Sequence, residues 1–135
     1  MAQLRFKQWL ANFNLDEAVT AEYQASFDSL KEITNAIQER LNEGLQGDPI
    51  SVDLEPGFQA KMGRQLNVKL RIPAKNFQDG LFRAYIPENG TPIQLDLYGD
   101  ELRVCKDVDE LQDALMAFIE EIKDRIVTYR SYADT

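Results

Sequence analysis

The sequence has no histidine, and Cys105 is its single cysteine among 135 residues. Histidine is the commonest general base and the commonest zinc ligand, so its absence removes the usual catalytic triads and most zinc sites. One cysteine cannot form an intrachain disulfide, which favours a reducing compartment, and we expect a cytoplasmic protein. Because no histidine is present to activate it, we expect the Cys105 thiol to be structural rather than nucleophilic.

Long apolar runs and catalytic motifs are also missing. No stretch approaches the ~18 apolar residues that span a bilayer, and the first residues lack the continuous apolar region of a signal peptide. Neither a glycine-rich phosphate loop nor G-x-S-x-G nor C-x-x-C occurs. We therefore expect no membrane association, no metal, no cofactor and no catalytic residue.

What is present has the composition of one globular domain over residues 1–135, with 44% hydrophobic and 28% charged residues. The net charge is −8, but it is segregated along the chain. Residues 13–48 hold eight acidic and two basic residues, and residues 107–135 hold eight acidic and three basic residues. Between them, one short segment gathers positive charge with no acidic residue among its members: Arg64, Lys69, Arg71 and Lys75.

The two acidic segments have the period of amphipathic helices. Apolar residues recur at steps of three and four from Leu15 to Leu45, and the same spacing runs from Val108 to Tyr129. These patterns predict a long helix over 14–47 and a C-terminal helix over 107–130.

Capping and stop residues mark the ends of both predicted helices. Asn14 with Glu17, and Asp107 with Glu110, have the three-residue spacing of a capping pair. Gly44, Gly47 and Pro49 end the first helix.

Residues 50–105 alternate between apolar and polar side chains and predict strands. The segments are 50–54, 66–72, 81–86, 93–98 and 101–105, and the last is predicted to turn Leu102 and Val104 inward. Turns are predicted at Pro56-Gly57, Asp79-Gly80, Asn89-Gly90 and Gly99-Asp100, with a loop over 55–63. Strict alternation gives each strand one dry and one wet face, which is typical of antiparallel sheets. We predict an α+β fold of α-β5-α order, an antiparallel meander with both helices packed on one face.

This helix–meander–helix order, with a sequence pI of about 4.5, resembles small secretion chaperones in architecture. Those chaperones usually interrupt the sheet with a helix, whereas residues 73–80 have room for a single turn.

The predicted first helix is longer than the sheet beneath it. Residues 15–46 would extend about 48 Å at 1.5 Å per residue, and five strands at ~4.8 Å are only about 24 Å wide. We expect residues 1–13, which supply Trp9 and Phe13, to pack on the surplus apolar stripe. The alternative is that another chain covers the stripe, as a homodimer or as a different partner.

The positive residues of the sheet have two interpretations. Ion pairing across strands with Asp53 and Asp96 would keep the outer face soluble. The other interpretation is a shallow basic platform for an acidic protein surface or a phosphate-bearing ligand. The candidate partner-binding residues are Lys69, Arg71, Arg83, Tyr85 and Arg103 of the sheet, together with Trp9 and Phe13 of the N-terminal segment. Nucleic acid is not expected to bind directly, since the overall field is negative.

The leading functional hypothesis is a non-catalytic protein-binding module, an adaptor, chaperone or inhibitor that contacts another protein or itself. The first alternative is an acidic mimic of nucleic acid that blocks a nucleic-acid-binding enzyme, because its helices carry many carboxylates. The second alternative is a small-ligand-binding or enzymatic domain that uses Asp, Arg and Tyr. That alternative requires a deep pocket lined by Arg83, Tyr85, Asp96 and Tyr98.

Overall fold

The computed structural model describes residues 2–14, 19–60, 63–98 and 102–135. These residues form four α-helices and one five-stranded antiparallel sheet, which confirms the predicted α+β class. The elements are α1 (Ala2–Ala11), α2 (Ala21–Asn42), β1 (Ser51–Ala60), β2 (Gly63–Ile72), the 3-10 turn η1 (Pro73–Lys75), β3 (Phe77–Ile86), β4 (Ile93–Asp96), β5 (Arg103–Cys105), α3 (Val108–Glu121) and α4 (Lys123–Ala133).

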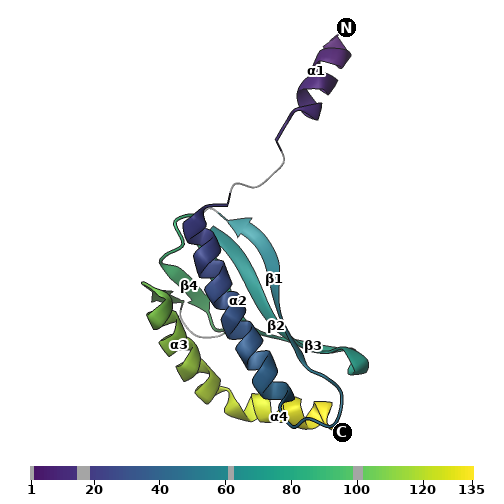
Figure 1. The fold of residues 1–135 in the computed structure, drawn as a ribbon, viewed down its shortest axis with the longest axis vertical. Helices are drawn as coiled ribbons and strands as arrows, with labels where there is room; N and C mark the ends of the chain where they lie inside the picture. The colour runs from purple at the N-terminus through teal and green to yellow at the C-terminus, as the bar shows by residue number, and fades with distance from the viewer. Residues whose placement is uncertain (1, 15–18, 61–62, 99–101) are drawn as a thin grey trace.

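The sheet is a meander in which each strand pairs with its neighbour in sequence, and α2, α3 and α4 lie on one of its faces (Figure 1). The predicted alternation along β2 is confirmed: Leu66, Val68, Leu70 and Ile72 are all buried, and the residues between them are half-buried. Their side chains join the helices in one core with Leu30 of α2 and Leu111 of α3. The hydrophobic effect therefore packs the helices on a single side of the sheet.

The long helix begins later than predicted. Helix α2 starts at Ala21, because Thr20 caps it by accepting a hydrogen bond from the backbone N–H of Tyr23 at 3.0 Å. The Thr20 hydroxyl also donates to the Glu88 carbonyl of the β3–β4 loop, a long-range contact that the local pattern at Asn14 could not reveal. The predicted partner Glu17 lies outside the described residues. The predicted stop is confirmed, since α2 ends at Asn42 and Gly44 takes a positive φ of 72°.

The C-terminal helix begins as predicted but is divided in two. Asp107 accepts a hydrogen bond from the Glu110 N–H at 2.9 Å, and the Glu110 carboxylate accepts one from the Lys106 N–H, so the capping pair is confirmed. At Ile122 the backbone leaves helical geometry (φ −98°, ψ 17°), and α4 continues in a new direction. This change of direction brings Tyr129 onto the first part of β3, where its ring lies 5.8 Å from that of Phe77.

Two predicted turns lie inside strands instead. Pro56-Gly57 is part of β1, where the register with β2 shifts between Pro56 and Gln59. Asp79-Gly80 is part of β3, opposite a second shift between Val68 and Lys69. Both dipeptides therefore mark β-bulges, which attract the same residue types as turns. The β2–β3 turn falls at 73–76, where Asn76 takes a left-handed conformation.

The inward face of the last strand was predicted one residue out of register. Leu102 and Val104 are 54% and 60% exposed, whereas Cys105 is buried. Cys105 pairs with the buried Ile93, and directly opposite residues share a face of the sheet. Pairing with β4 therefore overrides the local alternation.

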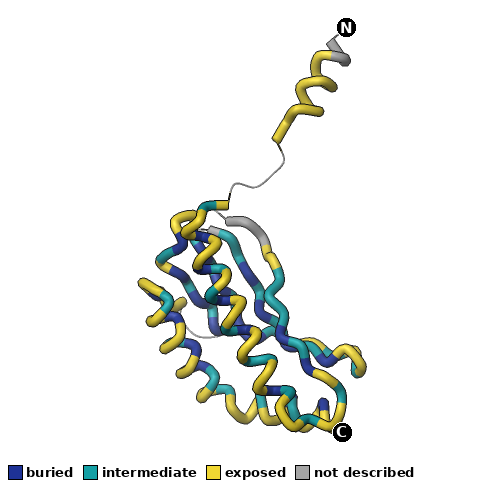
Figure 2. Tube along the Cα trace, viewed as in Figure 1, coloured by how far each residue is buried: buried dark blue, intermediate teal, exposed yellow. Residues whose placement is uncertain are grey.

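The N-terminal segment was expected to pack on the surplus apolar stripe of the long helix, and the structure contradicts this expectation. Helix α1 lies apart from the sheet and the other helices (Figure 1), and its residues from Arg5 to Ala11 are all exposed (Figure 2). Four large apolar side chains among residues 5–13 are 49–63% exposed: Phe6, Trp9, Leu10 and Phe13.

Candidate functional site: an apolar groove between two helices

The predicted basic surface on the outer face of the sheet is largely charge-paired. The Lys69 Nζ lies 3.2 Å from the Glu55 Oε2, and the Arg71 Nε lies 3.2 Å from the Asp53 Oδ2. Arg71 also bonds Glu55. These cross-strand pairs match the solubilising interpretation, and partly exposed pairs of this kind contribute only about 0–1 kcal/mol each.

The other candidate residues of the sheet are spread over both faces. Arg83 lies opposite Asp96 in register, and its guanidinium sits 5.4 Å from the Tyr98 ring centre. The Tyr98 side chain, and more weakly Tyr85, raise the pKa of Arg83 above its ordinary value. Arg103 pairs with the buried Leu95 and so belongs to the helix-covered side, away from Lys69 and Arg71.

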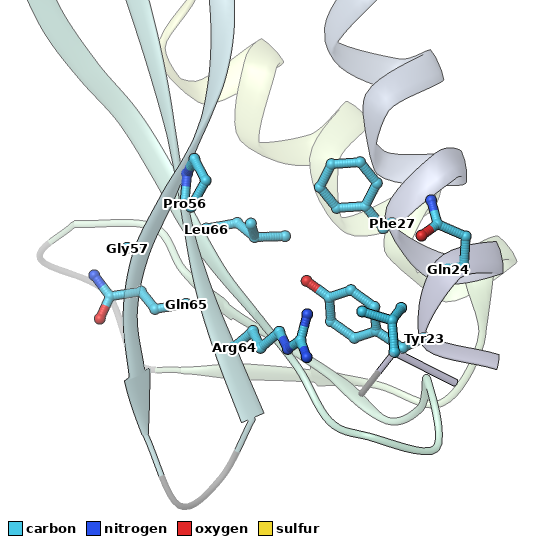
Figure 3. Close-up of a pocket in the computed structure, with 9 residues that line it drawn as sticks. Tyr23, Gln24, Phe27, Pro56, Gly57, Arg64, Gln65 and Leu66 are labelled. Carbon is cyan, nitrogen blue, oxygen red and sulfur yellow. The ribbon is translucent and has the colours of Figure 1, made fainter. Parts of the chain in front are cut away.

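Arg64, at the start of the basic run, points toward α2. It pairs with the buried Ile86 and its guanidinium lies 4.7 Å from the Tyr23 ring centre. This contact helps to frame a hollow of about 260 Å³ (Figure 3). The hollow lies between the first turns of α2, the second half of β1 and the first residues of β2. Phe27 and Leu66 line the hollow further along α2 and β2, and Pro56 and Gly57 of the β1 bulge line its other side. The sequence predicted a loop here, so the hollow was not anticipated.

A second and more apolar cavity lies between α2 and α3. It is a groove of about 360 Å³, and its lining is almost entirely hydrocarbon. The lining residues are Ile33, Ala36, Ile37, Arg40 and Leu41 of α2, Gln112, Leu115, Met116 and Ile119 of α3, and Ile126 of α4. We call this cavity the α2–α3 groove.

The groove exists because the apolar stripes of both helices are wider than their contact with the sheet. Leu30 and Leu41 point into the core, while Ile33 and Ile37 on the neighbouring positions stay half-buried. On α3, Met116 is 60% exposed although Leu115 beside it is buried. A stripe much broader than the buried seam leaves apolar surface between the two helices.

On the helical period, acidic positions of α2 and α3 lie next to the positions that line the groove. The exposed carboxylates that flank the lining positions on the helical period are Glu32, Glu39, Glu43, Asp109, Asp113 and Glu120. Arg40 is a basic residue in the lining, and its Nη1 lies 3.6 Å from Glu43. The groove therefore combines an apolar floor with a negative border.

The described residues offer no evident reactive centre. Burial, followed by the nearby Glu110 carboxylate, raises the pKa of the Cys105 thiol, which makes it a poor nucleophile. No group of three or more Cys, Asp or Glu side chains in the described part of the chain could hold a metal ion. Within the same residues, no helix has the length and apolar character needed to cross a membrane.

One polar network ties α4 to the sheet. The Tyr129 hydroxyl donates to the Asp79 carboxylate of β3, and the Arg125 Nε donates to the Tyr129 oxygen at 2.9 Å. Burial, and then the hydrogen bond to Asp79, raises the pKa of Tyr129 above its usual range. We assign this network a structural role. Arg125 also donates to the Gly80 carbonyl of β3 at 3.1 Å, which attaches α4 to the sheet at a second point.

Comparisons with protein-family models, with curated proteins and with solved structures found no match. The candidate site therefore depends on geometry alone. The helical period predicts that Ile33, Ile37 and Ile119 lie on apolar stripes, but it does not give the distance between two helices that are remote in sequence, so it does not predict a shared groove. The one sequence feature that could have indicated the groove is Met116, an apolar residue outside the predicted stripe, which the structure shows to be exposed.

Proposed function

We propose that this protein is a non-catalytic protein-binding module whose contact surface is the α2–α3 groove. The observation that supports this function most directly is the open apolar channel between two helices, whose lining includes the half-buried Ile37 and the exposed Met116. Apolar grooves between helices commonly receive the apolar face of a third, amphipathic helix. The exposed carboxylates on the rim favour a partner helix whose polar face is basic.

A model helix provides the test. A fluorescein-labelled peptide with leucines at i, i+3, i+4 and i+7 and lysines elsewhere is titrated with the full-length protein, and binding is followed by fluorescence anisotropy. Met116→Asp places a charge in the groove at an exposed position, so the fold is expected to survive. Val127→Asp is the matched control, because Val127 is a similarly exposed apolar residue of α4 that does not line the groove.

We expect Met116→Asp to raise the dissociation constant at least tenfold, about 1.4 kcal/mol, and Val127→Asp to change it less than twofold. Equal binding by the wild type and both variants, or no binding by any of them, would reject the groove as the contact surface.

A second candidate function is binding of a small aromatic anion in the hollow beside α2. Arg64 supplies a positive charge there, Tyr23 and Phe27 supply aromatic walls, and the volume exceeds the ~150 Å³ that holds benzene in an engineered cavity. Benzoate titration followed by NMR tests this candidate. Shifts at Tyr23 and Leu66 that vanish in Arg64→Gln but persist in Arg103→Gln support it, and shifts that are absent or scattered reject it.

A further inference from the structure

Helix α1 presents an apolar face that the described parts of its own chain leave exposed. Phe6, Trp9, Leu10 and Phe13 follow i, i+3, i+4 and i+7 spacing, so they lie on one side of the helix and its final turn. The three aromatic rings form a continuous row, with 5.8 Å between the centres of Phe6 and Trp9 and 5.2 Å between those of Trp9 and Phe13. An exposed row of this size typically marks an interaction surface.

The charges of α1 complement those of the groove. Residues 1–13 contain Arg5 and Lys7 and no acidic residue, whereas exposed carboxylates of α2 and α3 border the groove. Opposite charges at the rim raise the association rate and favour this pairing over others.

The dimensions also agree. The row from Phe6 to Phe13 extends about 10.5 Å along the helix axis, and the α2 wall from Ile33 to Leu41 extends about 12 Å at 1.5 Å per residue. Ala36 lies in the middle of that wall, and a small side chain there lets an incoming helix approach closely.

We propose that α1 of one copy docks in the α2–α3 groove of a second copy, and that reciprocal exchange of the two helices makes a homodimer. The proposal rests on the proposed function of the groove and names its occupant. A second copy is the occupant because α1 lies apart from α2 and α3 of its own chain (Figure 1). Within two copies, each exposed apolar row meets an open groove.

The area that two docked helices would bury reaches the lower limit of a specific interface. Three aromatic side chains of about 200 Å² and one leucine, each roughly half exposed here, would remove about 400 Å² of α1 from water. The groove lining adds a smaller area than the α1 row, and two docked helices give roughly 1,100 Å² in total, just above the ~1,000 Å² that a specific interface needs.

Trp9 is the only tryptophan, so its fluorescence reports on α1 alone. The full-length protein is examined from about 0.1 to 100 µM by analytical ultracentrifugation and by emission spectrum. We expect the mass to double and the emission to shift to the blue together. Raising the salt from about 0.05 to 0.5 M is expected to weaken the dimer several-fold, because the rim charges are then screened.

Two complementary variants identify the surfaces. Met116→Asp keeps α1 and damages the groove, whereas Phe6→Ala/Phe13→Ala keeps the groove and damages α1, with Trp9 retained as reporter. Each variant alone is expected to dimerise at least tenfold more weakly than the wild type. An equimolar mixture recovers association, because one intact α1 meets one intact groove, and Val127→Asp behaves as the wild type.

Three outcomes would overturn the exchange. A monomer with exposed Trp9 at 100 µM shows that α1 does not dock. A monomer whose Trp9 is shielded at every concentration places α1 in its own groove. A dimer that both variants leave intact uses another surface. Binding of the model helix by the Phe6→Ala/Phe13→Ala variant, in any of these cases, would leave the proposed function standing, whereas loss of that binding as well would remove both.

Discussion

Helices α1 and α3 have the same kind of apolar row but opposite surroundings. On α3, Leu111, Leu115 and Phe118 are at most 3% exposed, whereas Trp9 and Phe6 on α1 are 57% and 63% exposed. Helical period is therefore enough to form a row on one side of a helix, but it does not determine what covers that row. Coverage depends on how the helix is attached to the rest of the chain.

The attachments of the two helices differ. Only Lys106 and Asp107 separate Cys105 of β5 from the first residue of α3, so α3 is held on the sheet as soon as the strand pairs. Nine residues separate α1 from α2. A short connection makes neighbouring elements pack together, whereas a longer one leaves the position of the helix open to other contacts.

Truncation of one aromatic residue in each helix tests this contrast with the largest expected effect. Phe118 packs edge-on against Phe82 with 6.2 Å between ring centres. Phe118→Ala should lower the free energy of unfolding by about 3–5 kcal/mol, because it removes buried contacts and leaves a cavity. Trp9→Ala should change it by less than about 0.5 kcal/mol at concentrations where the protein is monomeric, as measured by urea denaturation.

Phe118→Leu serves as a milder control that keeps most of the buried volume, and it should cost under about 1.5 kcal/mol. Equal losses from Phe118→Ala and Trp9→Ala in dilute protein would mean that α1 belongs to the core, and the contrast between the two helices would then be wrong.

A smaller effect is expected from the polar tie of α4, for which α1 has no counterpart among the described residues. Tyr129→Phe removes the hydrogen bond to the Asp79 carboxylate and should cost about 1.5 kcal/mol, the lower end of the range for bonds to charged groups. Arg125 retains its ion pair with Asp79 at 3.6 Å, so the variant should remain folded.

Tyr129 also predicts how the free energy of unfolding changes with pH. The pKa of Tyr129 is raised in the folded state, so the native protein holds this proton more tightly than the unfolded chain, whose tyrosine pKa is about 10. Its stabilisation is complete below about pH 10 and is lost as the pH rises through the folded pKa. Denaturation between pH 8 and 11 should show a steeper alkaline loss for the wild type than for Tyr129→Phe, and parallel curves would contradict the assignment.

The parts predicted correctly depended on contacts close in sequence. The alternation from Leu66 to Ile72 predicted the buried face of β2. The pair Asp107 and Glu110 predicted a helix cap whose hydrogen bonds span only four residues. Prediction failed where a distant segment decided the outcome. Thr20 caps α2 while also bonding Glu88, and Cys105 turns inward because Ile93 lies opposite it.

The candidate site was the least predictable part for the same reason. Its two walls are about 75 residues apart in sequence, and the position of α1 relative to them follows from no local pattern. Lys69 and Arg71 were proposed as site residues because positive charge is unusual in this acidic chain. The structure shows that they form ion pairs with β1 and do not line the groove.

The smallest expected effect compares polar residues at the ends of the two helices. Asp107→Ala removes the side-chain acceptor for the Glu110 N–H and should cost about 1 kcal/mol. Asn12 also makes a hydrogen bond at a helix end, donating from its Nδ2 to the Gln8 carbonyl at 3.1 Å. Asn12→Ala should leave the free energy of unfolding unchanged within error, because fraying of α1 exposes no core. A loss of about 1 kcal/mol from both changes in urea denaturation would instead mean that α1 folds and unfolds together with the sheet.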